Sequence, residues 1–467
     1  DVWKLSDTRM NIFTGLILCQ CLVLTSAATG CPNTLECKCT FDLIDCSGRD
    51  LTSVPRFTPS DTVFQTLRLD RNRLTYIHNN SFFGIKVSDI LLNENSISSV
   101  DHGAFYGVED RLNELDISSN SLLYLPSSIG TLNHIRNLAI SDNPIDQTAF
   151  DTGEDVLRRV GDTLYEFSFG HDVVYEWPHT LRHLATLKTL NVLGGSFKTL
   201  PPGAFHGFEG TLLNLRIENT KLIAIPVALS RLIYLERLNF DHNHNIGDAG
   251  ILVPAFSSAI MRHLTDLTLK DDSLTVFPNI LKYLQQVRKL SLEGNKLDVI
   301  GDNSIQIIES SNVEDLSLRN CSLNRVPGAI SRMRNLRVLD LSKNYIRTFE
   351  RNDFTNMTWI TNLTVSDNPL DYISPDAFSG VHNLMYLNLQ GTMLREMPTA
   401  IENTPSLRDI ILPSDQIMCS CDLAWLRMYM DRYGHQLHVQ GTCETIISEI
   451  QNYLNTFIPM CPNYYSG

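Results

Sequence analysis

An apolar and polar pattern of eleven residues recurs along the chain. It is clearest in LRVLDLSKNYI, residues 336–346, which reads L-x-x-L-x-L-x-x-N-x-I. Leu339 and Leu341 alternate with Asp340, which is the periodicity of a strand with one face toward a core. The Asn344 amide has donors and an acceptor, so it can satisfy buried backbone groups of the coils on either side. Each unit is therefore predicted to be one coil that stacks on the next.

Fifteen such units can be aligned by the residue at the Asn position. These residues are Asn72, Asn95, Asn120, Asn143, Asp172, Gly195, Thr220, Asn243, Asp272, Asn295, Cys321, Asn344, Asn368, Thr392 and Asp415. The first spacings are 23, 25, 23 and 29 residues, and the next four repeat them in order, which indicates a duplicated block of four units. The pattern predicts an α/β solenoid with one curved parallel sheet, and disfavours an ordinary globular α/β domain.

The sheet is expected to contain fifteen strands, with one or two more from the ends of the chain. The extra residues of the two 29-residue units, which end at Asp172 and Asp272, are predicted to lie on the convex side, so that the strands stay in register. Helical stretches are predicted in EDVLRRV near Val156 and in AFSSAIM near Phe256. One kind of unit carries a proline where the coil leaves the strand, at Pro126, Pro178, Pro226, Pro278, Pro327 and Pro398. The other kind carries an Ala-Phe pair, at Phe105, Phe205 and Phe378, and the phenylalanine rings are predicted to fill the convex side.

The first thirty residues read as a leader. Residues 10–30 contain the apolar runs IFTGLIL and CLVL followed by small residues, which is typical of a secretory signal peptide cut between about Ala28 and Gly30. The run is too short for a comfortable membrane span. Residues 1–9 are interpreted as an untranslated or non-native leader. We therefore expect an exported chain that begins near Cys31.

Cysteines bracket the repeats in two groups of four. Cys31, Cys37, Cys39 and Cys46 precede the repeats, and the second group follows them, at Cys419, Cys421, Cys443 and Cys461. In an exported chain such groups favour disulfides over a zinc site, and the end coils of a solenoid need a cover. Cys321 stands alone in the array and is interpreted as a buried thiol, with an intermolecular disulfide as the alternative.

The two cysteine segments resemble the caps of a known protein family. CPNTLECKCTFDLIDCSGRDLTSVP and CSCDLAWLRMYM are similar to the amino- and carboxy-terminal caps of extracellular leucine-rich repeat proteins. These include Slit proteins, small leucine-rich proteoglycans, Toll-type ectodomains and secreted invertebrate proteins such as the non-catalytic subunit of a crustacean luciferase. The resemblance implies a horseshoe with caps at 31–62 and 418–461, repeats at 63–417 and a tail at 462–467. It also implies the disulfides Cys31–Cys39, Cys37–Cys46, Cys419–Cys443 and Cys421–Cys461.

Charge and motifs exclude several functions. The formal net charge is -14, which disfavours nucleic acid and anionic membrane surfaces as partners. The chain contains none of the G-x-S-x-G, H-E-x-x-H, G-x-G-x-x-G or P-loop patterns, so we predict no catalysis and no cofactor. His242 and His244 beside Asp241 could hold a metal weakly, but a polar turn is the favoured interpretation.

The concave face is the candidate binding surface. Its middle row is predicted to be Arg68, Leu91, Asp116, Ala139, Ser168, Asn191, Arg216, Asn239, Thr268, Ser291, Ser317, Asp340, Thr364, Asn388 and Ile411. Acids flank this row at Glu114, Asp142, Glu166, Glu218, Asp241, Asp266, Asp271, Glu293 and Asp315. The middle of the arc is therefore expected to attract a basic or polar protein, with Glu218, Asp241, Asp266 and Glu293 as the docking residues. A solvated face without a ligand is the alternative.

Four sequons for N-glycosylation occur, at Asn79, Asn320, Asn356 and Asn362. Asn79 and Asn356 are predicted to lie off the strands, and Asn320 and Asn362 to project from strands onto the concave side. The sequence as a whole indicates a secreted protein for recognition or adhesion. Three alternatives remain open: a structural matrix component, a non-catalytic subunit of a secreted enzyme, and a truncated receptor ectodomain.

Overall fold

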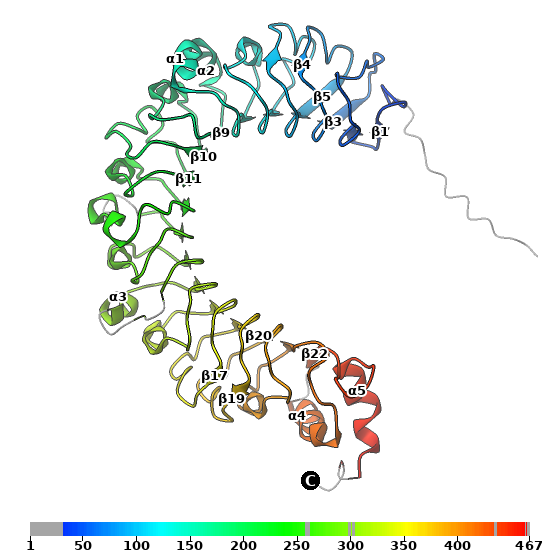
Figure 1. Cartoon of the computed structure of the whole chain (residues 1–467), viewed down its shortest axis with the longest axis vertical. Coiled ribbons are helices and arrows are strands. Elements are labelled where there is room, and N and C mark those ends of the chain that lie inside the picture. The colour runs from blue at the N-terminus through cyan, green and yellow to red at the C-terminus, as the bar shows by residue number, and fades with distance from the viewer. Residues whose placement is uncertain are drawn as a thin grey trace, which may run out of the picture.

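The structure is a computed structural model that describes residues 31–256, 262–297, 300, 304–433, 437–462 and 464. The predicted signal peptide and the residues before it lie outside this part. The described residues form a curved solenoid with the shape of a horseshoe (Figure 1). The strands of its main sheet line the inner, concave side, and the longer helices lie on the outer side.

The main sheet contains eighteen strands of the described residues. They are β1 (Lys38–Cys39), β2 (Leu43–Asp45), β3 (Val63–Arg68), β5 (Lys86–Leu91), β7 (Glu114–Asp116), β8 (Asn137–Ala139), β9 (Glu166–Phe169), β10 (Thr189–Gly195), β11 (Asn214–Thr220), β12 (Arg237–Asp241), β13 (Asp266–Thr268), β14 (Lys289–Ser291), β15 (Asp315–Ser317), β16 (Val338–Asp340), β18 (Asn362–Thr364), β20 (Tyr386–Asn388), β21 (Asp409–Ile411) and β22 (His438–Gln440). Fifteen of them belong to the predicted units. The ends of the chain add β1, β2 and β22, one strand more than predicted, and only β1 is antiparallel to its neighbour.

The register of the main sheet follows the repeat. Arg68 lies opposite Leu91, Leu91 opposite Asp116, and this row of residues continues strand by strand to Ile411. This is the predicted middle row, which confirms that each unit supplies one strand. A parallel register of this kind presents side chains of successive coils in straight rows about 4.8 Å apart.

Helices form part of several coils, and turns form the rest. The α-helices are α1 (Gln147–Thr152), α2 (Glu154–Val160), α3 (Ile305–Glu309), α4 (Ala424–Tyr433) and α5 (Ile450–Thr456). The 3-10 helices are η1 (Ser127–Thr131), η2 (His179–His183), η3 (Val227–Arg231), η4 (Asp248–Gly250), η5 (Val253–Phe256), η6 (Asn279–Lys282), η8 (Gly328–Arg332), η9 (Thr399–Asn403), η10 (Cys421–Leu423) and η11 (Ile458–Met460). Six of the 3-10 helices begin directly after the predicted prolines, whose fixed φ suits the start of a helical turn.

The two long units keep the sheet intact, as predicted. In the first of them, α1 and α2 lie on the outer side of the arc (Figure 1), and α2 coincides with the predicted stretch EDVLRRV. In the second, Asn239 of β12 still lies opposite Thr268 of β13. Only η5 is present near the second predicted helical stretch, because residues 257–261 lie outside the described part.

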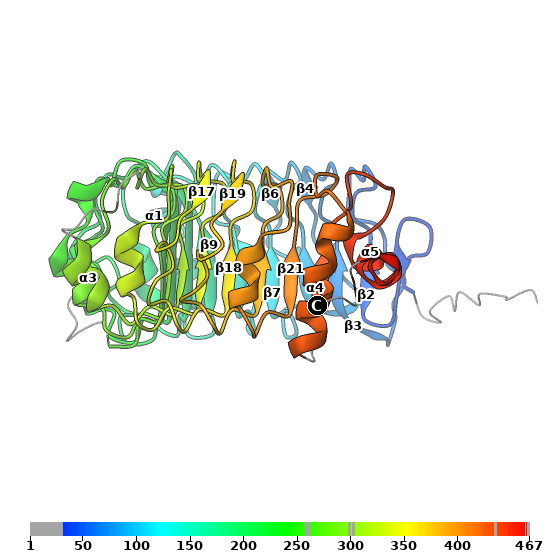
Figure 2. The ribbon, with the colours of Figure 1, turned by 90° about the horizontal axis from the view of Figure 1, so that it is seen from below.

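Two small parallel sheets were not predicted. One pairs β4 (Tyr76–Ile77) with β6 (Ser99–Val100), and the other pairs β17 (Thr348–Phe349) with β19 (Tyr372–Ile373). Figure 2 shows both along one edge of the solenoid, away from the strands of the main sheet. They form where two neighbouring units, each with a phenylalanine five residues after the small strand, place the same short segment side by side.

The core runs the length of the solenoid as stacked rows. Phe105 of an Ala-Phe unit is buried, as predicted, and it stacks at 5.6 Å between ring centroids on Phe82 of the previous coil, which follows a serine. The asparagines at the Asn position of the repeat, which we call the ladder asparagines, join each coil to the previous one. For example, Asn143 Nδ2 donates to the Ile117 carbonyl of the previous coil at 2.9 Å, and its Oδ1 accepts from Leu122 N at 3.0 Å. Such bonds satisfy backbone groups that the turns leave buried.

Disulfides close both ends of the array. Cys31–Cys39 and Cys37–Cys46 hold β1 and β2, and Cys419–Cys443 and Cys421–Cys461 hold η10, α4, β22 and α5 together. These are the four pairs that the resemblance implies. They fix the small end elements over the first and last coils, whose apolar cross-sections water would otherwise reach.

Candidate functional site

The predicted docking residues are less available than the sequence indicated. Glu218 is only 6% exposed and forms a double hydrogen bond with the Arg216 guanidinium, of which one is 2.7 Å long. Asp241 is 4% exposed and accepts from Thr268 Oγ1 at 3.0 Å and from Lys270 N at 3.2 Å. Glu218 is therefore neutralised within its own strand and Asp241 is bonded to the next coil, which corrects the expectation that both carboxylates are free to face a partner.

The other two predicted docking residues are half-exposed but paired. A carboxylate oxygen of Asp266 lies 3.9 Å from Lys289 Nζ. Glu293 lies 3.7 Å from Lys270 Nζ and 3.3 Å from Arg319 Nε. The basic partners come from adjacent coils, 23 to 26 residues away in sequence. Because the prediction counted only the acids, it made the middle of the arc more negative than it is.

A cluster of four acids without a basic partner lies nearer the amino-terminal end of the concave face. They are Asp89 on β5, Glu114 and Asp116 on β7, and Glu166 on β9, and we call them the acidic patch. None of the four forms an ion pair in the part of the chain that the structure describes. The patch therefore carries negative charge that a partner could neutralise.

Neutral donors hold the acidic patch in place. Asp89 accepts from Gln65 Nε2 at 2.7 Å, Asp116 from Ser118 N at 2.9 Å, and Glu166 from Asn191 Nδ2 at 2.9 Å. Burial raises the pKa of Glu114, and the neighbouring carboxylate of Asp89 raises it further, with smaller contributions from Asp116 and Glu166. A nearby cation would reverse these repulsions, so the patch favours a positively charged partner.

Sequence reasoning identified only part of this patch. Glu114 and Glu166 stood among the flanking acids and Asp116 in the middle row, but Asp89 was missed. Asp89 lies directly opposite Glu114 in the sheet, so the aligned repeats already showed that the two acids are neighbours.

Two basic residues lie next to the patch. The Arg136 guanidinium is 5.3 Å and Lys188 Nζ is 4.8 Å from the centroid of the Tyr165 ring.

The four sequons lie at accessible places. Asn79 and Asn356 are exposed and off the strands, and Asn362 is the half-exposed first residue of β18. Asn320 was expected on a strand, but it lies three residues beyond the end of β15, exposed and with φ of 54°. It lies in the turn because the strand of this unit ends at Ser317. The turn needs a residue in the left-handed backbone conformation, which asparagine adopts more easily than most residues.

Other candidate chemistry is structural. His242 Nε2 lies 3.3 Å from Asp271 Oδ2, and across the described residues no group of three or more His, Cys, Asp or Glu side chains is placed to hold a metal ion. Cys321 is fully buried and its thiol donates to the Leu292 carbonyl at 3.1 Å, while burial raises its pKa to about 12. A thiol in that setting is inert, which disfavours an intermolecular disulfide.

Comparison with known proteins agrees with this architecture. Residues 85–145, 311–370 and 360–417 match the model of the family described as leucine rich repeat. The chain has the leucine-rich repeat fold. A solved leucine-rich repeat protein of Leptospira interrogans superposes with a TM-score of 0.55 at 19% identity, over 85% of this chain and 94% of that one.

Several curated leucine-rich repeat proteins are similar in sequence. Leucine-rich repeat-containing protein 3 of Danio rerio is 34% identical over 136 residues, 28% of this chain and 49% of that protein. Podocan of Mus musculus is 24% identical over 402 residues, 80% of this chain and 63% of podocan. CD180 antigen of Mus musculus is 24% identical over 72% of this chain and 54% of that protein. The chain thus spans less than two thirds of each relative, and these comparisons indicate no enzyme family. No helix of the described residues is long and apolar enough to cross a membrane.

Proposed function

We propose that this chain is a secreted, extracellular protein that binds a basic or polar protein through its concave face. The acidic patch carries the proposal, because it gathers the half-exposed carboxylates of Glu114, Asp116 and Glu166 around the buried one of Asp89, on one preformed surface and without basic partners among the described residues. A sheet that is hydrogen-bonded from coil to coil needs little ordering on binding. The patch replaces the middle of the arc as the docking site.

The cysteines support an extracellular location. Eight of them form four disulfides at the two ends of the array. Such bonds persist in secreted proteins and are rare in the cytosol. The remaining described cysteine, Cys321, is buried as a thiol and needs no partner chain.

A capture experiment with two matched variants tests the proposal. Glu114→Gln, Asp116→Asn and Glu166→Gln together remove charge from the patch and keep the shape of each side chain. Asp266→Asn with Glu293→Gln removes charge that basic neighbours already compensate. Wild type and both variants are incubated with extracellular extract, and the proteins that they retain are quantified by mass spectrometry.

The proposal predicts one basic protein that wild type and the Asp266/Glu293 variant retain and that the patch variant loses. With that protein in hand, its association rate should fall about tenfold or more in the patch variant at low salt, where charge steering acts most strongly. Equal retention of every protein by all three forms, each still folded, would remove the patch from the function.

A further inference from the structure

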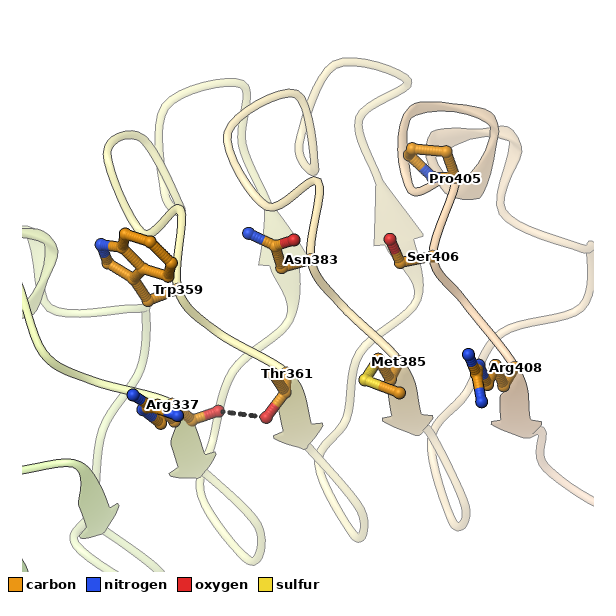
Figure 3. A pocket seen from close by; sticks show the side chains of 8 residues that line it. All are labelled: Arg337, Trp359, Thr361, Asn383, Met385, Pro405, Ser406 and Arg408. Atoms are coloured by element: carbon orange, nitrogen blue, oxygen red, sulfur yellow. Dashed lines mark hydrogen bonds between the residues drawn. The ribbon is translucent and has the colours of Figure 1, made fainter. Parts of the chain in front are cut away.

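A second surface of different chemistry lies near the carboxy-terminal end of the array. It is a cavity of about 470 Å³, lined by Arg337, Trp359, Thr361, Asn383, Met385, Pro405, Ser406 and Arg408, and we call it the Trp359 pocket. Figure 3 shows that Arg337, Thr361, Met385 and Arg408 stand just before four successive strands, β16, β18, β20 and β21, with Trp359 and Asn383 in the loops above them. The pocket therefore follows the edge of the sheet where these strands begin.

The tryptophan of this pocket contributes little to the core of the fold. Trp359 is 60% exposed, and no hydrogen-bond or aromatic partner of its side chain occurs in the described part of the chain. Trp177 provides the contrast, because it is buried, packs against three aromatic rings, and donates from Nε1 to the Ala204 carbonyl at 2.8 Å. A large exposed indole beside a methionine is the composition that protein interfaces favour.

The two arginines at the ends of the pocket carry positive charge beyond what their neighbours neutralise. Glu314 is shared, since one oxygen lies 3.6 Å from Arg337 Nε and the other 3.5 Å from Arg288 Nε. Arg408 forms no ion pair with any acid among the described residues, and its neighbour Asp409 lies 3.5 Å from His438 instead. Guanidinium groups in this state bind carboxylates by paired, charge-assisted hydrogen bonds.

We propose that the Trp359 pocket binds an extended acidic segment of a partner protein. Arg337 and Arg408 precede strands that are three spacings apart, so they lie on the order of 14 Å from each other. Four residues of extended chain span about the same length, and side chains at i, i+2 and i+4 face the same way. The segment that fits has a carboxylate at i, an apolar side chain at i+2 and a carboxylate at i+4. The apolar side chain packs on Met385 between the two arginines, and Trp359, which stands above Arg337 in Figure 3, covers that end of the segment.

This site is independent of the acidic patch, because it uses other residues, the opposite end of the array and the opposite charge. A partner could contact both surfaces, or two partners could bind at once. The probe is an array of nine-residue peptides that vary positions i, i+2 and i+4 through acidic, basic, apolar and neutral polar residues. The full chain, produced by a host that glycosylates secreted proteins, is applied to it.

The array should select Glu or Asp at i and i+4 with Leu or an aromatic residue at i+2. Arg408→Glu should lower the signal of these peptides about tenfold or more and shift the preference at one end from Glu to Lys. Trp359→Ala should lower it about thirtyfold, as for a tryptophan that an interface buries. Lys343→Glu and Tyr345→Ala change an exposed charge and an exposed aromatic ring in the turn after β16, and should leave the selection unchanged.

Three results would overturn the proposal. One is an array with no preference for acidic peptides, and another is a preference that Arg408→Glu and Trp359→Ala leave intact. The third concerns the sequon at Asn362, the residue after Thr361 of the pocket lining. If acidic peptides bind only after removal of the Asn362 glycan or in Asn362→Gln, the chain's own sugar occupies this place in the secreted protein. The patch variant serves as a further control, since it should bind the array as wild type does.

Discussion

Single residues in the ladder decide how firmly successive coils are joined. Asp272 replaces asparagine in a fully buried place, where its Oδ1 accepts from Asn243 N at 2.8 Å and its Oδ2 has no partner among the described residues. Asn295 in the next coil instead donates from Nδ2 to the Leu269 carbonyl. Burial raises the pKa of Asp272 to about 9, and Asp241 and Asp271 add to the rise. Asp272 is thus neutral at pH 7 in the folded chain.

Asp272→Asn should therefore stabilise the protein in a pH-dependent way. An unfolded Asp loses its proton near pH 4, whereas folded Asp272 keeps it to about pH 9. Between these values the unfolded chain binds fewer protons, so this residue lowers the free energy of unfolding as pH rises. We expect the gain to be on the order of 5 kcal/mol larger at pH 8 than at pH 4.5, because each pH unit between the two pKa values contributes about 1.4 kcal/mol. Denaturant unfolding at both pH values measures this, and an equal gain at both would contradict a protonated Asp272.

At the scale of elements, the end caps should behave as separable units. Cys421–Cys461 closes a loop with a sequence separation of 40 residues around α4, β22 and α5. Removal of a disulfide of this size costs about 2–4 kcal/mol. Cys421→Ser with Cys461→Ser should therefore open the carboxy-terminal cap first, because each coil touches only its neighbours.

Hydrogen exchange followed by mass spectrometry locates that opening. Protection should fall in β22 and α5 and stay unchanged in β5 to β9 at the other end of the array. Matched loss of protection along the whole chain would show that the solenoid unfolds as one unit, against the nearest-neighbour description.

Some helices and strands of this fold could be predicted from the sequence, and others could not. The strand register could be predicted because Leu and Asn recur at fixed offsets, and α2 because EDVLRRV has helical spacing of its apolar residues. The two-residue strands β4, β6, β17 and β19 have no alternating pattern of their own and depend on the neighbouring coil. The prolines were expected where the coil leaves the strand, and the structure places them directly before 3-10 helices such as η1 and η2, which were not predicted.

The candidate site was less predictable because charge compensation is not local. Glu218 and Asp241 alternate outward along their strands, as predicted, but the side chains of Arg216 and Thr268 cover or bind them. Whether an acid on the concave face is paired depends on residues of the coils before and after it. The sequence supplied the row and the sign of the charge. It did not show that the predicted docking acids are buried or paired, while Glu114, Asp116 and Glu166 on β7 and β9 form a cluster without basic partners among the described residues.

At the scale of the whole molecule, the horseshoe carries two proposed interaction surfaces of opposite charge. The acidic patch lies on the sheet toward the amino-terminal end, and the Trp359 pocket lies on its edge toward the carboxy-terminal end. The net charge of -14 favours encounter with a basic partner at long range. The two arginines act only at short range, within about 10 Å at ordinary salt.

Carboxyl footprinting of a complex tests the central claim, that a partner docks on the concave face, most directly. The chain is labelled with a carbodiimide and a small amine, alone and with the protein that it retains from extracellular extract. The account predicts slower labelling in the complex at Glu114, Asp116 and Glu166, and equal labelling at Asp155, an exposed acid of α2 on the convex side. Protection at Asp155 or at the caps, with unchanged labelling of the acidic patch, would contradict it.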